Sequence, residues 1–155
     1  MTETITMTPV GLVHTRRMAA EDDAWGPEAA DIVLDSRRFG PAALTGLEAF
    51  SHVEVLFHFH QAPAETVETG ARHPRGNTAW PKVGIFAQRG KDRPNRIGAT
   101  ICEILSVDGT TLTVRGLDAI DGTPVLDLKP VMAGFLPRGP LHEPLWAKEL
   151  MRRYW

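Results

Sequence analysis

Polar and apolar positions alternate with a period of two over much of the chain, and this pattern predicts strands rather than long helices. The alternation is clearest over residues 54–61. Because successive side chains of a strand point to opposite faces, one face of this strand is apolar and the other carries two histidines, His58 and His60. The apolar face consists of Val55, Phe57 and Phe59.

Further segments rich in β-favouring residues are separated by turn residues. Asp108-Gly109 favours a tight hairpin, because both central residues of that turn need positive φ. Many short strands at this interval predict a mainly β fold, either a barrel or a sandwich. The predicted strands besides 54–61 are residues 5–15, 31–34, 83–87, 97–107, 110–115 and 125–128.

Helical signals are few. Thr45 is a predicted N-cap, and Glu48 three residues later completes a capping-box pattern for one or two turns over residues 46–51. Residues 144–155 predict an amphipathic C-terminal helix, with Pro144 suited to its first turn. Such a helix with exposed aromatic residues packs on its own domain or on a second subunit.

The composition is that of one ordinary globular domain. The chain has 155 residues, of which 43% are hydrophobic and 23% charged, and a formal net charge of −2. DNA binding is not expected from this balance, and any polyanion would have to meet a local basic patch. No run reaches the ~18 apolar residues of a membrane span. The N-terminus lacks a signal-peptide pattern, so a cytoplasmic protein is expected. The single cysteine, Cys102, is expected to be a buried and inert thiol.

A strongly basic loop follows the predicted strand at residues 83–87. Arg89, Lys91, Arg93 and Arg96 place four cations within eight residues. Glycine and proline make this stretch a loop, and loops on a rigid scaffold are where binding groups collect. Two interpretations stay open at this point: a solvated basic surface, or a binding site for an anion.

Two pairs of polar residues are candidates for chemistry. His58 and His60 share one strand face and could hold a metal if a third ligand arrived, but the sequence offers no convincing one, so no metal site is predicted. Asp118 and Asp121 lie three apart in a glycine-bracketed loop. They could cap backbone amides, or they could bind hydroxyl or ammonium groups.

Several stretches together resemble the TsaA-like family. The most specific are Arg-Pro-Asn-Arg-Ile-Gly at residues 93–98 and Leu-Asp-Ala-Ile-Asp-Gly-Thr-Pro-Val at residues 117–125. The best-known members of this family are S-adenosylmethionine-dependent methyltransferases of threonylcarbamoyl-adenosine in tRNA. The resemblance implies a single antiparallel β-barrel domain with a short internal helix and a C-terminal helix. It also implies a homodimer that methylates the tRNA anticodon loop, with cofactor sites near the subunit interface. Supporting stretches are residues 46–52, 59–61 and 84–89.

The resemblance also implies roles for particular residues. Arg89 is the candidate for gripping the carboxylate of S-adenosylmethionine. Candidate bases for removing the acceptor's proton are His60, Asp118 and Asp121. Contacts to the acceptor or its phosphates are expected from Lys91, Arg93, Asn95 and Arg96. The expected cofactor-binding residues are His60, Gln61, Arg89, Ala99, Leu117, Asp118, Ala119 and Ile120.

The chain departs from the family pattern at several points. Arg96 stands where a proline is common, and Trp25-Gly26-Pro27 is the nearest match to an N-terminal cofactor segment of the Gln-Pro-Gly type. The chain stops at Trp155, so a short form is expected, without the extra C-terminal domain that helps longer members hold tRNA. Two alternatives to a tRNA methyltransferase therefore stay open: a methyltransferase for a small metabolite, and a metal-binding or non-catalytic barrel.

Overall fold

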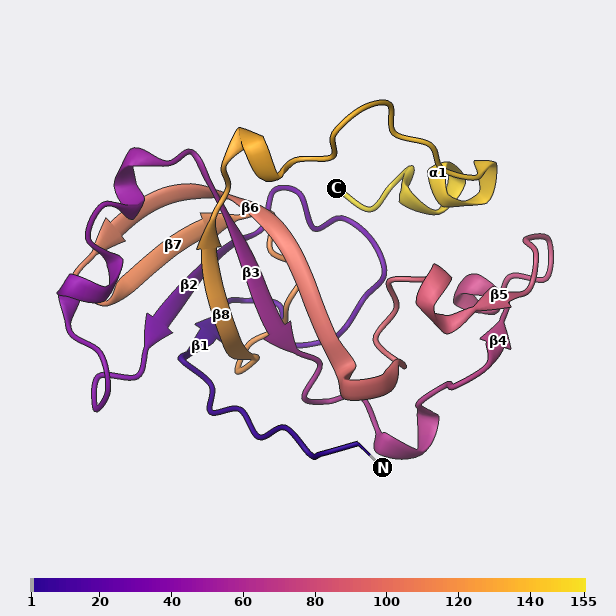
Figure 1. The fold of residues 1–155 in the computed structure, drawn as a ribbon, viewed down its shortest axis with the longest axis horizontal. Coiled ribbons are helices and arrows are strands. Elements are labelled where there is room, and N and C mark those ends of the chain that lie inside the picture. Colours follow the sequence, from indigo (N-terminus) through magenta and orange to yellow (C-terminus); the bar gives the residue numbers. More distant parts are fainter. Residues whose placement is uncertain (1) are drawn as a thin grey trace.

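Six strands close into an antiparallel barrel in the computed structural model, which describes residues 2–155 (Figure 1). Around the barrel the strands follow the order β1-β2-β7-β6-β3-β8. The predicted mainly β fold and its antiparallel barrel are therefore confirmed. The strands are β1 (Gly11–His14), β2 (Ala29–Leu34), β3 (His52–His58), β6 (Ile97–Asp108), β7 (Thr111–Arg115) and β8 (Pro124–Pro130).

Shorter elements occupy the connections. They include one α-helix, several single turns of 3₁₀ helix and a second, two-stranded sheet. Within residues 2–155, none of the helices has the length and apolar character needed to cross a membrane. The two-stranded sheet consists of β4 (Ala71–Arg72) and β5 (Val83–Gly84). The helices are η1 (Pro41–Leu44), η2 (Leu47–Ala49), η3 (Ala64–Thr66), η4 (Pro74–Gly76), η5 (Ile85–Ala87), η6 (Pro94–Arg96), η7 (Ala133–Phe135) and α1 (Leu145–Met151).

The barrel interior contains the apolar face that was predicted for residues 54–61. Val53, Val55 and Phe57 are buried on β3 and alternate with residues that are exposed or half-buried. Cys102 lies in the same core, where burial raises the pKa of its thiol to about 12. Because the thiolate is the nucleophilic form, this thiol is unreactive near neutral pH, as expected.

In the barrel, β3 lies between β6 and β8. Phe57 on β3 pairs with Gly98 on one side and with Val125 on the other. A Cβ atom on Gly98 would lie 2.5 Å from the Phe57 ring. The ring therefore fills space that only glycine leaves open, and it fixes the end of β3 that leads into residues 59–61.

The predicted helix at residues 46–51 is a single 3₁₀ turn, η2, and it starts differently from the prediction. Gly46 precedes it at φ +91°, and the Gly46 N–H donates to Glu48 Oε2 at 3.0 Å. Thr45 instead ends η1 and provides no side-chain cap. The Glu48 half of the capping box is therefore present, and the Thr45 half is wrong. The C-terminal helix is present but shorter than predicted, since α1 covers only 7 residues.

The strand predicted over residues 83–87 is largely wrong. Only the two residues of β5 are extended, and the chain then turns into η5. The buried Gln88 side chain explains the turn, because its amide donates to the carbonyls of Arg72 and Val83 at 3.2 and 2.9 Å. An interaction with a residue 16 positions away therefore outweighs the local preference for an extended backbone.

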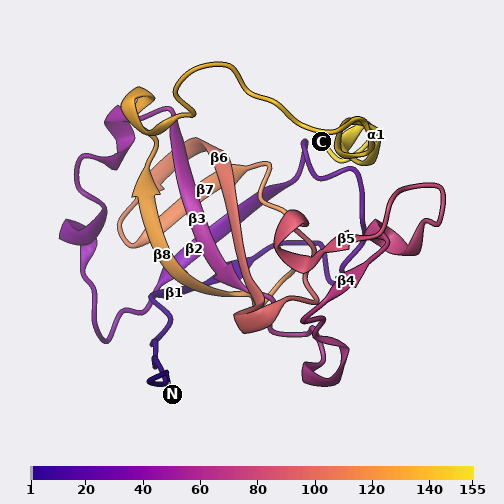
Figure 2. The same cartoon turned by 45° about the vertical axis from the view of Figure 1, so that its right-hand side comes forward.

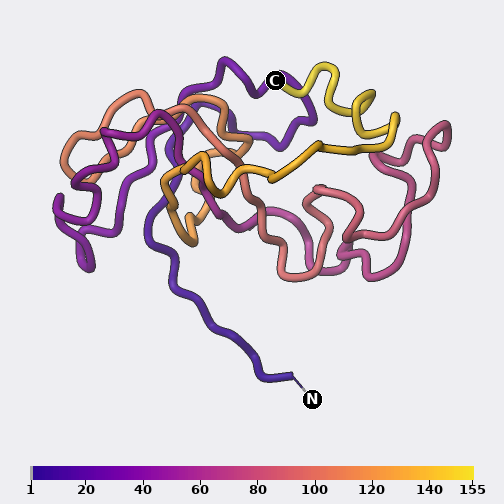
Figure 3. Tube along the Cα trace, turned by 45° about the horizontal axis from the view of Figure 1, so that its top comes forward, coloured from indigo at the N-terminus to yellow at the C-terminus, as the bar shows by residue number. Residues whose placement is uncertain are grey.

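The strand predicted over residues 5–15 is shorter than expected. The strand covers only residues 11–14, with Val10 still hydrogen-bonded to Val125 and Asp35. The preceding segment leads away from the barrel (Figure 3). Pro9 has no N–H to donate to a ladder, and Ile5 in the departing segment is 82% exposed. We call residues 2–9 the N-terminal arm.

The hairpin between β6 and β7 is confirmed, although its turn falls one residue later than predicted. Asp108 still pairs with Thr111, so the two central residues are Gly109 and Thr110. Of these two residues only Gly109 has a positive φ, of +59°, whereas the sequence expectation was a positive φ at both.

Because the strands are antiparallel, each connection lies at one of the two ends of the barrel. Residues 15–28, 59–96 and 116–123 meet at one end, which we call the loop end. At the opposite end lie residues 35–51 and the β6–β7 hairpin. The segment after β8 crosses from that opposite end and brings α1 to lie beside β4 and β5 (Figures 1 and 2). The C-terminus therefore returns to the loop end.

Candidate functional site

The residues expected to bind a cofactor gather at the loop end. His60 and Gln61 follow β3, Arg89 lies between η5 and η6, and Ala99 is near the start of β6. The remaining candidates, residues 117–121, form the connection between β7 and β8. The fold therefore brings together at one end of the barrel segments that are distant in the sequence.

A chain of hydrogen bonds joins two of these segments. Arg89 Nη2 donates to the Ala99 carbonyl oxygen at 2.5 Å. The next residue, Thr100, donates its hydroxyl to Asp118 Oδ1 at 2.5 Å, and the Tyr154 hydroxyl donates to Asp118 Oδ2. Arg89 is otherwise exposed, so its other N–H groups can grip an anion.

In the β7–β8 connection, the groups that could contact a ligand are backbone N–H groups rather than the apolar side chains. Leu117, Ala119 and Ile120 are 1%, 4% and 7% exposed, so their side chains belong to the core. Within residues 2–155, the N–H groups of residues 117–120 have no hydrogen-bond partner. Because buried N–H groups are normally paired, this run of donors is suited to receiving a ligand.

His60 lies against the same connection. A Cβ atom on Gly122 would be 3.8 Å from His60 Nε2. The side-chain hydrogen bonds of histidines within residues 2–155 involve His52 and His73, not His60. The His60 ring is therefore available to a ligand, whereas Gln61 is simply exposed beside it.

The two aspartates of the connection have different surroundings. Asp121 Oδ1 accepts the Thr15 N–H at 3.1 Å and lies 3.9 Å from His14 Nδ1. Asp121 thus has the amide-capping role that the sequence left open. Asp118 instead receives two hydroxyl groups and remains half-buried next to the unpaired N–H groups.

The basic loop divides into braced and free residues. Arg93 donates to the Gln88 carbonyl oxygen at 2.6 Å, and Arg96 donates to the Ala62 carbonyl oxygen at 2.7 Å. These two cations hold the loop in place. Lys91 and Asn95 are exposed, so they are the residues of this group that face solvent.

A half-buried ion pair between Arg72 and Asp92 anchors the basic loop to β4. Arg72 Nη1 donates to Asp92 Oδ2 at 3.0 Å, and the Thr66 hydroxyl donates to Asp92 Oδ1 at 2.8 Å. Burial alone would raise the pKa of Asp92, but the hydrogen bonds from Arg72 and Thr66 outweigh it and the pKa is lowered. The carboxylate is therefore ionised at neutral pH and keeps the loop attached.

Among the described residues, His58 at the end of β3 and His60 just beyond it have no third metal ligand. Within residues 2–155, no group of three or more His, Cys, Asp or Glu side chains is arranged to hold a metal ion. Burial lowers the pKa of His58, and the positive charge of Arg96 and the neighbouring His60 lower it further. His58 is therefore neutral at physiological pH, which suits a structural position beside cations.

Sequence reasoning missed Thr100 and Tyr154. Thr100 lies in a strand that was correctly predicted, but nothing in the sequence showed which side chain would meet Asp118. Tyr154, the only tyrosine of the chain, lies 36 positions from Asp118. Burial, the nearby Asp118 carboxylate and the hydrogen bond to it raise the pKa of Tyr154, so its hydroxyl remains a protonated donor.

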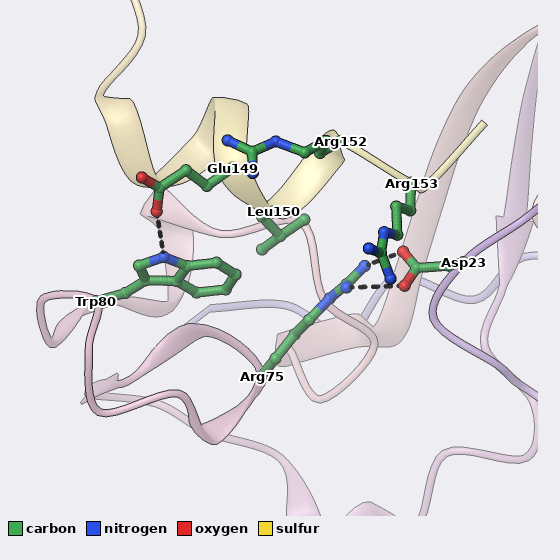
Figure 4. A pocket seen from close by; sticks show the side chains of 7 residues that line it. All are labelled: Asp23, Arg75, Trp80, Glu149, Leu150, Arg152 and Arg153. Atoms are coloured by element: carbon green, nitrogen blue, oxygen red, sulfur yellow. Dashed lines mark hydrogen bonds and ion pairs between the residues drawn. The ribbon is translucent and has the colours of Figure 1, made fainter.

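A small cavity lies next to the chain end, between α1 and the β4–β5 connection (Figure 4). Its volume is about 210 Å³. Trp80 Nε1 donates to Glu149 Oε2 at 2.7 Å across it, and Arg75 pairs with Asp23 at 3.1 Å. The lining residues are Asp23, Arg75, Trp80, Glu149, Leu150, Arg152 and Arg153.

The fold is a closed antiparallel barrel whose candidate binding residues lie at one end. A model of the tRNA-methyltransferase O N-terminal domain matches residues 16–135. The chain belongs to this family, and the resemblance found in its motifs is confirmed.

Individual relatives agree with this assignment. The human tRNA (adenine(37)-N6)-methyltransferase is 42% identical over 103 residues, which are 66% of this chain and 23% of the human protein. A probable S-adenosyl-L-methionine-binding protein of Methanothermobacter thermautotrophicus is 38% identical over 130 residues, 81% of this chain and 89% of that protein. The chain therefore spans less than a quarter of its human relative but most of the Methanothermobacter protein.

A solved structure supports the fold. The crystal structure of TrmO from Pseudomonas aeruginosa superimposes with a TM-score of 0.73 at 28% sequence identity. The superposition covers 90% of this chain and 61% of that chain.

Proposed function

We propose that this protein is an S-adenosylmethionine-dependent N-methyltransferase that acts on threonylcarbamoyl-adenosine in the anticodon loop of tRNA. The observation that carries the proposal is the convergence at the loop end of Arg89, Asp118 and the unpaired N–H groups of residues 117–120. Family membership supports it, because relatives are named as a tRNA (adenine(37)-N6)-methyltransferase and as a probable S-adenosyl-L-methionine-binding protein.

The donors and acceptors of this site fit the proposed cofactor. S-Adenosylmethionine has a carboxylate, an ammonium group, ribose hydroxyls and an adenine ring, and when bound it supplies an activated methyl group. The exposed N–H groups of Arg89 suit the carboxylate, and Asp118 suits the hydroxyls or the ammonium group. The N–H groups of residues 117–120 suit the acceptor nitrogens of adenine. Because the methyl group is already activated, positioning supplies much of the rate.

His60 is the base that the geometry favours among the three candidates. Asp118 already accepts hydrogen bonds from two hydroxyl groups, and Asp121 accepts a hydrogen bond from the Thr15 N–H. The His60 ring lies next to the β7–β8 connection without such a partner. An amide-like acceptor nitrogen has to lose a proton as its bond to the methyl carbon forms, and an imidazole nitrogen can take that proton.

The tRNA would approach across the exposed part of the basic loop. Lys91 and Asn95 face solvent there, and Arg152 and Arg153 are exposed beside the small cavity. Arg93 and Arg96 contribute mainly by bracing the loop through backbone carbonyls. Phosphate contacts of this kind predict that tRNA affinity falls as the salt concentration rises.

The decisive experiment measures methyl transfer from labelled S-adenosylmethionine into tRNA with and without the threonylcarbamoyl group. We expect label only in the modified tRNA. If no label is transferred, a separate calorimetric measurement of cofactor binding distinguishes the two possible reasons. If the cofactor binds but neither tRNA is labelled, the acceptor is another molecule, such as a small metabolite. If the cofactor does not bind, the methyltransferase proposal itself is wrong.

We further propose that the protein acts as a homodimer in the cytoplasm, where its tRNA substrate is found. The segment that runs from β8 to α1 exposes large apolar side chains, and such patches mark interaction surfaces. Phe135, Leu141 and Leu145 are 88%, 74% and 70% exposed. Light scattering on the purified protein should give twice the mass of one chain, and a monomer at all concentrations would contradict this part of the proposal.

A further inference from the structure

The end of the chain reaches the candidate cofactor site although it lies outside the family match. That match ends at residue 135, and Tyr154 follows it by 19 residues. The Tyr154 hydroxyl nevertheless donates to Asp118 Oδ2, on the opposite oxygen from the Thr100 hydroxyl. Tyr154 and Asp118 are both half-buried, so this contact is partly shielded from solvent.

The backbone around Tyr154 is fixed against the β1–β2 connection. The Ala24 N–H donates to the Arg153 carbonyl oxygen at 3.0 Å, and the Trp25 N–H donates to the Tyr154 carbonyl oxygen at 2.8 Å. A Cβ atom on Gly26 would lie 2.7 Å from the carbonyl carbon of Trp155. Residues 24–26 therefore form a close-fitting seat for residues 153–155, which we call the C-terminal tail.

The seat is itself rigid. Trp25 is 3% exposed, and its Nε1 donates to the Glu21 carbonyl oxygen at 3.0 Å. The Arg17 guanidinium lies 3.7 Å from the centre of the Trp25 ring and donates to the carbonyl oxygens of Asp23 and Ala24. A tail held on such a seat has little freedom, so the Tyr154 hydroxyl is presented to Asp118 in one place.

We infer that Tyr154 is a positioning residue of the cofactor site, which holds the Asp118 carboxylate in the orientation that receives the hydroxyls or ammonium group of S-adenosylmethionine. This inference rests on the proposed function. Each carboxylate oxygen has two acceptor directions, and the hydroxyls of Thr100 and Tyr154 use one on each oxygen. One direction on each oxygen remains for the ligand, and the two hydroxyls determine where it points.

The opposite role would be competition, in which the tail occupies Asp118 and must leave before the cofactor binds. The two roles predict opposite changes in cofactor affinity when the Tyr154 hydroxyl is removed. If Tyr154 positions Asp118, removal of its hydroxyl weakens cofactor binding. If the tail competes with the cofactor, the same removal tightens it. The fixed seat favours positioning, because a tail that had to leave would have to break its hydrogen bonds to Ala24 and Trp25.

The first test is Tyr154→Phe, which removes the hydroxyl and keeps the ring. Because a hydrogen bond to a charged group is lost, we expect the dissociation constant for S-adenosylmethionine, measured by calorimetry, to rise about tenfold or more. Trp155→Phe is the matched control, because it alters the neighbouring ring and leaves the Tyr154 hydroxyl in place. We expect that control to bind like the wild type. Unchanged or tighter binding by Tyr154→Phe would overturn the inference.

A double-mutant cycle separates positioning from a general loss of structure. If Tyr154 acts through Asp118, then adding Tyr154→Phe to Asp118→Asn should weaken binding no further than Asp118→Asn does alone. Losses that simply add would show that Tyr154 acts independently of Asp118, and the inference would fail. A wild-type protein that binds no cofactor at all would instead refute the proposed function.

Hydrogen exchange provides a measurement that needs no substitution. The N–H groups of Ala24 and Trp25 report directly on the docked tail, because they donate to its carbonyl oxygens. Positioning predicts that saturating S-adenosylmethionine slows their exchange in the wild-type protein. Faster exchange on binding would show that the tail is displaced, which contradicts the inference.

Discussion

At the scale of single residues, Arg89 has the most direct proposed task. It is exposed, and within residues 2–155 a single hydrogen bond, to the Ala99 carbonyl oxygen, ties its side chain to the barrel. Its role can therefore be removed with little effect on the fold.

Replacing Arg89 with Ala should weaken S-adenosylmethionine binding by about tenfold or more, because a bidentate contact to the carboxylate is lost. Thermal stability should change little. Lys91→Ala is the matched control from the same loop, since Lys91 is exposed and has no proposed cofactor contact. Calorimetry on both variants checks the prediction. Equal cofactor affinity in Arg89→Ala and the wild type would remove Arg89 from the site.

His58 makes stability depend on pH. Folding lowers its pKa through burial and through Arg96 and His60, so the unfolded chain takes up a proton at a higher pH than the folded chain does. The contribution of neutral His58 is therefore complete above about pH 6.5 and declines as the pH falls through the folded-state pKa.

The melting temperature of the wild type should consequently fall more between about pH 7 and about pH 5 than that of His58→Gln, which cannot titrate there. Thermal unfolding at several pH values provides the measurement. Parallel curves for the two proteins would show that His58 is not responsible.

The sequence identified candidate residues that lie within short motifs, but it did not identify their hydrogen-bond partners from distant parts of the chain. The motif at residues 117–125 directed attention to Asp118, and the structure places this residue at the loop end with the other candidates. The roles of these candidates remain predictions. Tyr154 could not have been found in this way, because its meeting with Asp118 depends on the path of the whole chain between them.

At the scale of elements, the period-two pattern was reliable where a strand has one buried face. β3, β6, β7 and β8 all follow predicted segments. The pattern failed at residues 83–87, where the apolar run is too short to set its own structure and the Gln88 side chain bends the chain. It also could not show that the N-terminal arm would leave the barrel.

The contact between β3 and β6 gives a sharp test of packing. Gly98→Ala would place a methyl group 2.5 Å from the Phe57 ring, so the ring or the strand has to move. We expect a loss of about 1–3 kcal/mol in the free energy of unfolding, as for other overpacked cores. Gly134→Ala is the control, because a Cβ atom there would meet nothing within 4 Å. Denaturant titration of both variants decides, and equal stabilities would contradict the packing argument.

At the scale of the whole molecule, the residues that stabilise the barrel and the candidate binding residues lie in different places. The core fills the barrel interior, while most of the candidate binding residues lie on the connections of the loop end. The candidate cofactor-binding residues lie on the connections 59–96 and 116–123 and on β6. A ligand that binds them together should therefore stabilise the whole fold and not one loop.

We therefore expect a single thermal transition that moves to higher temperature when S-adenosylmethionine is added. At about 100 times its dissociation constant, the cofactor should add about 2.7 kcal/mol, or roughly 5–10 °C for a chain of this size. Scanning calorimetry checks both points. Two separate transitions would contradict the prediction of one domain, and Arg89→Ala should show a smaller shift at the same cofactor concentration.

The seat formed by residues 24–26 also affects how the protein should be handled. Any peptide fused after Trp155 would continue from a carbonyl group that lies close to Gly26, since a Cβ atom on Gly26 would be 2.7 Å from its carbon. The N-terminal arm points away from the barrel and carries no proposed contact (Figure 3). Purification tags, surface-immobilisation handles and fluorescent labels therefore belong on the arm. A C-terminal tag could suppress cofactor binding in an otherwise intact preparation.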